Sequence, residues 1–521
     1  MKEKERGTLR KLEAKRKESI YLIIRGLEVG VAAGLISVLY RWLLSNAEGA
    51  LEYVIEYVKG SPVKTALWFV ALALLGVFVS LIVKWEPMAG GSGIPQVAGE
   101  IKGYLSPKWW RVTLAKLIGG TAAVFGGLSL GREGPSIQLG GMAAKGVAEI
   151  TKADKTTKLR MIACGGGAGL AAAFNAPLAG IMFVLEELQH TFDKSILCMG
   201  IVAAVTADFV SKIFFGQNTV FGYETANVPL RYYWLLVILG LLLGVLGAGY
   251  NVITLFGQSL FKKMKKVPWW VKFCAVFIIS GIVSFYIPQI LGGGHTMVEF
   301  LLTDHPAIPT MLFLLIAKFL FSVISFGSGA PGGIFFPLLI LGTYIGAIFG
   351  DASISLLGLE ANIWQEFVVI SMAGLFASIV RSPITGIILV FEMTGDINNL
   401  LPLAVVSLIS YAAANLIGVA PIYTSLLERI LEGQDSESPL PSKAEKVLKT
   451  YVVPTGSPID GKKISDIDWG KHCLIVSVER DEAPMTPKGD TVIRSGDELV
   501  LLISQRRFAR DCSRLERIIN G

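Results

Sequence analysis

The chain has 521 residues, of which 52% are hydrophobic and only 17% are charged, and its mean hydropathy is +0.58. Soluble domains carry roughly 25% charged residues, so this composition argues against disorder and against a nucleic-acid-binding role for most of the chain. The formal net charge is +7, but residues 1–20 hold eight Lys or Arg against four Glu, whereas residues 435–521 hold 14 basic and 14 acidic residues. The excess charge therefore marks a basic end, which the positive-inside rule assigns to the cytoplasm.

The same composition argues against several kinds of site. The five cysteines are odd in number and widely spaced, and the four histidines are scattered. They form no zinc spacing, no disulfide framework and no pattern typical of a histidine-based triad. We therefore expect a protein without a bound metal or cofactor, and not an enzyme.

Apolar runs recur from Tyr21 to about Ala420, and several approach the ~20 residues that a membrane-spanning helix needs. The continuous runs are Thr65–Val83, Ser195–Phe215, Tyr232–Ile253, Val271–Ile290, Met311–Phe326 and Leu401–Ala420. Two others, Gly165–Leu188 and Gly332–Gly350, are interrupted by Gly and Pro. Glycines inside such runs let membrane helices approach closely. The pattern predicts an all-α, multi-pass integral protein of the inner or plasma membrane, with a cytoplasmic N-terminus (1–20) and a lipid-embedded transmembrane domain (21–433).

Two segments of the apolar region resemble each other. Pro177 is followed by Glu186, and Pro383 by Glu392, in the shared pattern P-x-x-G-I-x-x-x-x-E. A Gly- and Pro-rich break lies upstream of each, at 131–135 in the first half and at 327–333 in the second. These matches predict an internal duplication with broken helices. Interrupted helices at matching positions of two halves are the usual sequence sign of a transporter's binding site.

Three motifs place Gly where the backbone would approach a ligand and Pro where a helix would begin. They are Gly91–Pro95 (GSGIP), Gly131–Pro135 (GREGP) and Gly333–Pro337 (GIFFP). The N–H groups at a helix start carry partial positive charge, so several starts that meet inside the membrane would bind an anion without a buried Lys or Arg. The alternative is that each motif is an ordinary loop at the membrane interface.

Glu133, inside the second motif, is the candidate for proton chemistry. A carboxylate in a low-dielectric site either finds partners or takes up a proton. In the ionised form Glu133 would compete with an anion for the same N–H groups, and in the protonated form it would leave, which couples proton movement to anion movement. The alternative is a salt bridge between Glu133 and its neighbour Arg132.

Glu186 and Glu187 occupy successive positions of one predicted helix and therefore face about 100° apart. Glu186 has a repeat mate in Glu392, which favours a shared structural role such as fastening a helix end. Glu187 has no mate, and we interpret it either as a proton entry point or as part of a solvated helix terminus. Lys116 either adds positive potential near the site or extends its amine to the membrane interface.

With these motifs, residues 20–430 resemble the CLC family of chloride channels and proton-coupled chloride transporters. GSGIP, GREGP, the GxFxP pattern of Gly333–Pro337 and a late Tyr423 stand in the family's order. The resemblance implies a homodimer of helical subunits, each with its own pore and an inverted internal repeat. It also implies that chloride is held by the hydroxyls of Ser92 and Tyr423 and by the backbone N–H groups of Ile334 and Phe335, with Glu133 as the gating glutamate and Glu187 as the internal proton-transfer glutamate.

Three positions bear on the branch of that family. Ser92, where some relatives carry Pro, resembles the chloride-preferring members, and Glu187 resembles the exchangers. Gln96 stands where a Glu is common after GSGIP. The resemblance therefore does not define the proton path near this position. The resemblance favours proton-coupled chloride antiport, with chloride and protons as substrates. A passive chloride-selective channel is the alternative, favoured if Glu187 has only a structural role.

The composition changes after Gly433. Residues 434–445 are interpreted as a Ser- and Pro-containing linker, and residues 446–521 as a small cytoplasmic α+β domain that contains the C-terminus. Alternating runs at Leu474–Val478, Thr491–Ile493 and Glu498–Ile503 predict strands. The pattern resembles the RCK-C (TrkA-C) regulatory domain of potassium-uptake regulators, which dimerises and in some members binds cyclic di-AMP.

By that resemblance Ile475 and Arg480 would contact a regulatory cyclic dinucleotide at a dimer interface. The alternative is a dimerisation domain without a ligand. A cation transporter controlled by this domain is a third hypothesis, which is disfavoured because the sequence contains no TVGYG-like carbonyl filter.

Overall fold

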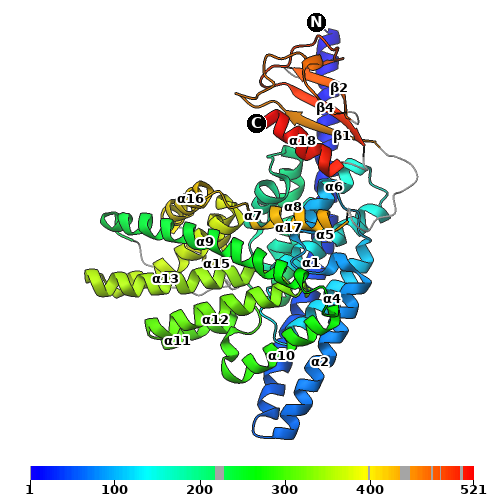
Figure 1. Ribbon diagram of the computed structural model, residues 1–521. Helices are drawn as coiled ribbons and strands as arrows, with labels where there is room; N and C mark the ends of the chain where they lie inside the picture. The colour runs from blue at the N-terminus through cyan, green and yellow to red at the C-terminus, as the bar shows by residue number, and fades with distance from the viewer. Residues whose placement is uncertain are drawn as a thin grey trace. The chain divides into compact units, whose positions relative to one another are not determined.

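The computed structural model describes residues 2–217, 228–396, 399–434, 446–470, 473–480, 483–504 and 508–520. The chain divides into two compact units, Met1–Leu427 and Glu428–Gly521, and each is described by itself. The first unit is helical, and the second contains a small sheet with a helix (Figure 1). Apart from residue 434, the predicted linker lies outside the described residues.

The helical unit consists of long helices interleaved with short ones. Those of the first half are α1 (Lys2–Val58), α2 (Pro62–Trp85), α3 (Ile94–Ile101), α4 (Trp109–Phe125), α5 (Glu133–Ile150), α6 (Lys155–Phe174), α7 (Pro177–Phe183) and α8 (Lys194–Phe215). Those of the second half are α9 (Tyr233–Lys263), α10 (Trp269–Tyr286), α11 (His295–Asp304), α12 (Ile308–Gly327), α13 (Phe335–Leu357), α14 (Trp364–Val380), α15 (Pro383–Thr394) and α16 (Leu400–Leu416), and α17 (Ile422–Gln434) follows them.

Among the described residues, eight helices are long and apolar enough to cross a membrane. They differ in how much of their length is buried: α14 is almost entirely enclosed by other helices, whereas little more than a quarter of α2 is buried. Exposed side chains on α2 include Leu67, Val70 and Leu74. An all-round apolar helix with an uncovered face is suited to contact with lipid rather than with water. The predicted multi-pass helical membrane architecture is confirmed.

The two halves repeat the same order of short and long helices. In the first half α3, α5 and α7 begin at Ile94, Glu133 and Pro177. In the second half α11, α13 and α15 begin at His295, Phe335 and Pro383. Gly131–Pro135 and Gly333–Pro337 contain the starts of α5 and α13, and the predicted second break, 327–333, covers the segment between α12 and α13.

Corresponding residues of the two halves contact each other reciprocally. The N–H of Gly131 donates to the carbonyl of Gly333 at 2.7 Å, and the N–H of Gly333 donates back to the carbonyl of Gly131 at 2.8 Å. Reciprocal contacts of this kind are what a two-fold axis between two similar bodies produces. The structure therefore confirms an inverted internal repeat.

Glycines allow the close helix pairs of both halves. A Cβ added to Gly140 on α5 would collide with the carbonyl of Gly165 on α6. In the second half, a Cβ on Gly346 of α13 would collide with the carbonyl of Phe367 on α14. Small residues let such backbones touch, and van der Waals contact then replaces the hydrophobic driving force that is missing between helices in lipid.

The second unit is an antiparallel sheet with one described helix, α18 (Phe508–Asn520). Its strands are β1 (Lys446–Val452), β2 (Cys473–Arg480), β3 (Ala483–Met485) and β4 (Glu498–Ser504), in the spatial order β1-β4-β2-β3. Two predicted strands lie within β2 and β4, which confirms the α+β class. The predicted strand Thr491–Ile493 is wrong, because only Val492 forms an isolated bridge there, to Lys463.

The sheet of the second unit has one covered and one open face. Leu499, Leu501 and Ile503 of β4 are fully buried, together with Leu515 and Ile519 of α18, and α18 lies beside the strands (Figure 1). The opposite face carries a row of three leucines across adjacent strands. Leu448 pairs with Leu502, and Leu502 pairs with Leu474. Leu448 and Leu474 are each 59% exposed.

Candidate functional site

The three Gly- and Pro-rich motifs come together in the interior of the helical unit. Gly91 of GSGIP bridges Pro331, two residues before the GIFFP segment, and Gly131 of GREGP bridges Gly333 within that segment. The N–H of Gly332 donates to the carbonyl of Gly91 at 3.1 Å, which joins the first and third motifs. The starts of α3, α5 and α13 therefore converge, and their first N–H groups have no partners inside their own helices.

Gly134 explains how closely the motifs approach. A Cβ on Gly134 would lie 2.8 Å from the carbonyl oxygen of Ser92 and 3.4 Å from the Cα of Gly333, and it would collide with the Ser92 hydroxyl. Only glycine leaves room for Ser92 at this point of α5. The loop before α3 adopts the left-handed conformation at Gly93, with φ +96°, so that α3 can begin at Ile94.

Two buried hydroxyls lie at this convergence. Ser92 and Tyr423, which is in the first turn of α17, are each 2% exposed. The two hydroxyls are close to each other, and neither oxygen makes a hydrogen bond of ordinary geometry within the described part of the chain. A buried unpaired hydroxyl is costly, so an unpaired couple is typical of a place where a polar ligand binds.

The start of α13 supplies backbone donors to the same region. Ile334 precedes the helix and Phe335 is its first residue, and both are buried. The Phe335 ring is held by Phe174 at 5.6 Å and by Phe376 at 4.9 Å between ring centroids. This aromatic packing fixes the direction of the first N–H groups of α13 and keeps the surroundings apolar.

Glu133 is the first residue of α5 and is fully buried. Neither of its carboxylate oxygens has a hydrogen-bond partner within the described residues. Its Oε1 lies 3.6 Å from Arg132 Nε, so the ion pair expected as the alternative role is present, although it is too long for a hydrogen bond. Oε2 lies beside Gly131, where an added Cβ would also contact Phe336 at 3.1 Å. The carboxylate is therefore directed toward the start of α13.

Glu186 and Glu187 are adjacent in the sequence but make different contacts. Both lie in a π-helical segment, Val184–Gln189, that follows α7. Oε2 of Glu187 accepts a hydrogen bond from Ser382 Oγ at 2.7 Å, and the residue is 6% exposed, so it is not a solvated helix terminus.

Glu186 and Glu392 each fasten the helix of the opposite half. Glu186 accepts hydrogen bonds from the N–H groups of Ile384 and Thr385 at 3.1 and 2.7 Å, at the start of α15. Glu392 accepts from the N–H groups of Leu178 and Ala179 at 3.0 and 2.8 Å, at the start of α7. The predicted shared role in fastening a helix end is confirmed, and the two helix starts so used are not available to an anion.

Two buried lysines support the motif loops, and only the first was considered from sequence. Lys116 on α4 is fully buried and donates to the carbonyls of Ala89 and Gly91 at 2.9 and 2.6 Å, so the interpretation as an interfacial amine is wrong. Lys318 on α12 is its repeat mate and donates to the carbonyls of Ile290 and Gly292, both at 2.9 Å. Lys318 could have been recognised from the sequence as the lysine of the second half that corresponds to Lys116 of the first half.

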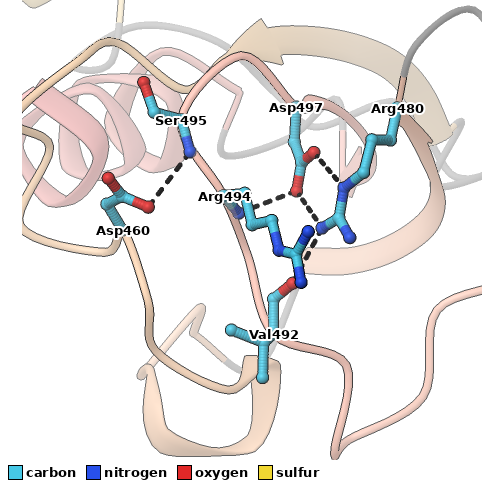
Figure 2. A network of polar contacts seen from close by, with 6 residues as sticks. All are labelled: Asp460, Arg480, Val492, Arg494, Ser495 and Asp497. Carbon is cyan, nitrogen blue, oxygen red and sulfur yellow. Dashed lines mark hydrogen bonds and ion pairs between the residues drawn. The ribbon is translucent and has the colours of Figure 1, made fainter.

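In the second unit, Arg480 is held inside its own fold. Its Nε and Nη2 donate to the two carboxylate oxygens of Asp497, both at 2.7 Å, and Nη2 also donates to the carbonyl of Val492 at 2.9 Å (Figure 2). The N–H of Arg494 donates to Asp497 at 2.8 Å. These contacts occupy donors of Arg480 that a ligand would need. Ile475, the other residue expected at a ligand, lies half-buried on β2.

Comparison with known proteins agrees with this arrangement. The family model for the voltage gated chloride channel matches residues 75–415. The chain belongs to the voltage-gated chloride channel (CLC) family. A second family model, for the TrkA-C domain, matches residues 448–512.

Several relatives of this CLC protein are named as transporters. It is 33% identical over 440 residues to the H(+)/Cl(-) exchange transporter ClcA of Klebsiella pneumoniae, covering 82% of this chain and 93% of that protein. It is 38% identical over 382 residues to ClcA of Vibrio parahaemolyticus, covering 70% and 81%. A solved slow cyanobacterial Cl-/H+ antiporter superposes with a TM-score of 0.74 at 30% identity, covering 80% of this chain and 99% of that one. A fluoride/proton antiporter of the CLC type shares the fold, with a TM-score of 0.64 at 20% identity.

Proposed function

We propose that this CLC protein is a proton-coupled chloride antiporter. The observation that carries the proposal is the buried Glu133 carboxylate, which has no hydrogen-bond partner in the described chain and lies where the starts of α5 and α13 meet. An anion site that contains its own titratable carboxylate ties the binding of the anion to that of a proton. The names of the ClcA relatives and of the cyanobacterial antiporter support the same activity.

In this mechanism chloride takes the place between the unpaired hydroxyls of Ser92 and Tyr423 and the N–H groups of Ile334 and Phe335. Chloride and the Glu133 carboxylate compete for the positive end of α13. When Glu133 takes up a proton it loses its attraction to those N–H groups, and chloride passes. Glu187 transfers protons between the cytoplasmic side and the site, and water completes the path.

The orientation of the protein follows from its basic end. We place the N-terminus and the C-terminal unit in the cytoplasm, since residues 1–20 carry a marked excess of Lys and Arg. We further propose a homodimer in which each subunit has its own site. Counting subunits by photobleaching of single labelled complexes tests the dimer, and a single step in most complexes contradicts it.

Flux measurements in liposomes test the proposed exchange. Purified protein is reconstituted with a chloride gradient and no proton gradient, and the external pH is recorded with an electrode. Antiport predicts that chloride moving down its gradient drives protons uphill. A chloride flux without proton movement supports the passive channel and contradicts the antiporter.

Substitution of Glu187 separates the antiporter from the channel. The hydrogen bond from Ser382 would also suit a purely structural Glu187, which is the observation that favours the channel. We expect Glu187→Gln, which keeps an acceptor for Ser382, to reduce proton transport to background while chloride flux persists. Unchanged proton transport in this variant would show that the carboxylate is structural.

We also propose a regulatory role for the TrkA-C unit, through pairing of two copies on the open face that carries Leu448 and Leu474. A cyclic dinucleotide, cyclic di-AMP, is the candidate ligand at that pairing; Ile475 follows Leu474 on β2, but it pairs with Leu501 of the covered face. The guanidinium of Arg480 is less available to this ligand, because it already donates two hydrogen bonds to Asp497. Calorimetric titration of the full-length protein with cyclic di-AMP tests this, and the absence of heat favours a dimerisation unit without a ligand.

A further inference from the structure

The connection between α16 and α17 determines where the Tyr423 hydroxyl lies. α16 ends at Leu416 and α17 begins at Ile422, so Tyr423 is the second residue of its helix. Gly418 turns the chain between the two helices with a φ of +79°. The carbonyls of such a connection have no partners in a helix ladder, so other groups must hold them in place. A shift of residues 417–421 would carry Tyr423 with it.

Arg381 binds this connection from the end of α14. Its Nη2 donates to the carbonyl of Ala414, in the last turn of α16, at 2.7 Å and to the carbonyl of Val419 at 3.0 Å. Its Nη1 donates to the carbonyl of Ser378 in the last turn of α14. The planar guanidinium can reach several carbonyls in a fixed geometry. It therefore ties the end of α14 to the segment that leads into α17.

Asn251 on α9 binds the same connection from a second side. The side chain is fully buried, and its Nδ2 donates to the carbonyl of Ala420 at 3.2 Å and to that of Ile379 on α14 at 3.0 Å. Ala420 is three residues before Tyr423. Hydrogen bonds from two other helices thus fix the backbone immediately before the start of α17.

The backbone of Arg381 indicates that its side chain has a task of its own. Arg381 ends α14 in the left-handed conformation, with φ +73°, which residues with a Cβ rarely adopt. Pro383 corresponds to Pro177, so Arg381 corresponds to Asn175, which ends α6 with φ +55°. Asn tolerates this conformation, and the turn alone needs no arginine. The contacts of the guanidinium are what the second half adds to the repeated turn.

We propose that Arg381 and Asn251 are positioning residues for chloride, which hold the start of α17 so that the Tyr423 hydroxyl meets the ion. This inference rests on the chloride site of the proposed function. A hydroxyl that is already in place binds an ion without a further ordering cost, whereas a helix start that can shift spends part of the binding free energy on its own ordering. Both residues act through the backbone of residues 417–421.

The test measures chloride binding to two variants of the purified full-length protein. Arg381→Asn copies the residue of the first half and suits the left-handed backbone, and Asn251→Leu keeps a similar volume but removes the donor. Chloride is titrated calorimetrically into protein in detergent and chloride-free buffer. We expect each variant to raise the chloride Kd about fivefold, the scale of one misplaced hydrogen bond. Because Asn251 is neutral, its effect cannot come from a lost charge.

Tyr423→Phe supplies a measurement that a merely structural role would not change. We expect Tyr423→Phe to raise the chloride Kd on the same scale. Arg381→Asn or Asn251→Leu should then add little to it, since the hydroxyl that they position is gone and the effects are coupled. Arg160→Gln is the control: Arg160 lies on α6, is partly exposed and is 3.6 Å from Asp193. It should bind chloride as the wild type does.

The outcomes separate this inference from the proposed function. If Tyr423→Phe binds chloride as tightly as the wild type, the proposed chloride site fails. If Tyr423→Phe weakens binding but Arg381→Asn and Asn251→Leu do not, the positioning role is overturned. It is also overturned if these two variants weaken binding by the same factor with and without the Tyr423 hydroxyl. Arg381→Gly, which also suits the left-handed backbone, replaces Arg381→Asn should that variant fail to fold, with the same expected effect.

Discussion

Glu133 shows how one residue combines the features that couple two ions. It begins α5, it is fully buried, and its carboxylate meets the start of a second helix from the opposite half. Its ion pair with Arg132 is loose at 3.6 Å, so the pair does not bind the carboxylate permanently. A tightly hydrogen-bonded pair would have made Glu133 structural, which was the alternative from sequence.

The first prediction concerns the charge of Glu133. We expect Glu133→Gln to abolish proton transport while chloride flux persists, because glutamine has nearly the same shape as a protonated glutamate and cannot titrate. The chloride flux of the variant should also lose its dependence on pH. Paired chloride and pH-electrode recordings measure both effects. Retained proton coupling would remove Glu133 from the mechanism.

The control for this variant is Glu149→Gln. Glu149 is an exposed residue of the same helix α5, paired with Lys158 at 2.7 Å on the surface. Exposed ion pairs contribute little to stability, so we expect wild-type coupling from this variant.

At the scale of elements, two carboxylates join the halves. Each belongs to one half and caps the start of a helix in the other half. Glu186 binds the start of α15 and Glu392 binds the start of α7, across 199 residues between Glu186 and Thr385. A carboxylate at a helix start pairs with the orphan N–H groups and with the positive end of the helix dipole. The arrangement makes the interface of α7 and α15 specific for one register.

The second prediction concerns these caps. We expect Glu186→Gln and Glu392→Gln each to lower the stability of the protein by about 1–2 kcal/mol, since each weakens charge-assisted bonds to two N–H groups. The apparent melting temperature of the purified protein in detergent measures the change, with Glu149→Gln as the surface control. A loss of stability in only one of the two variants would contradict the equivalence of the repeats.

At the scale of the whole molecule, the chain contains a helical CLC unit and a TrkA-C unit. Different interactions stabilise the two units. The helical unit depends on small residues and buried lysines that satisfy loop carbonyls. The second unit depends on a sheet core and on the Arg480–Asp497 pair (Figure 2). Burial alone would raise the pKa of Asp497, but the hydrogen bonds from Arg480 and from the Arg494 N–H outweigh it and lower that pKa below the ordinary value.

The third prediction concerns this pair and pH. Because the pKa of Asp497 is lower in the folded state than the ordinary value of about 3.9, the pair stabilises the fold above that pH and the stabilisation is lost as the pH falls through the folded pKa. At neutral pH Asp497→Asn removes the charged partner of the part-exposed Arg480, which costs about 1–2 kcal/mol, the scale of a hydrogen bond to a charged group. Hydrogen exchange of β2 and β4 in the full-length protein measures both effects.

The control is Asp468→Asn, which removes a fully exposed partner of Arg514 and should leave the exchange unchanged. Equal effects of Asp468→Asn and Asp497→Asn would contradict a special role for the buried pair.

Sequence alone determined the membrane class and placed two helix starts at Pro135 and Pro337, within two residues of the actual starts at Glu133 and Phe335, because hydropathy and Gly-Pro chemistry act over a few neighbouring residues. It also indicated the duplicated Glu186 and Glu392. It missed Lys318 and strands β1 and β3, and it predicted a strand at Thr491–Ile493 where only an isolated bridge forms. Those features depend on which segments pack together, and a local pattern carries no record of that packing.

Only the tertiary structure decided what each candidate side chain contacts. Lys116 turned out to bind the loop carbonyls of Ala89 and Gly91, Glu186 to cap a helix of the other half, and Arg480 to be occupied by Asp497. The physical reason is the same in each case: a buried charge must be paired, and its partner is selected by the geometry of chain segments that meet in space.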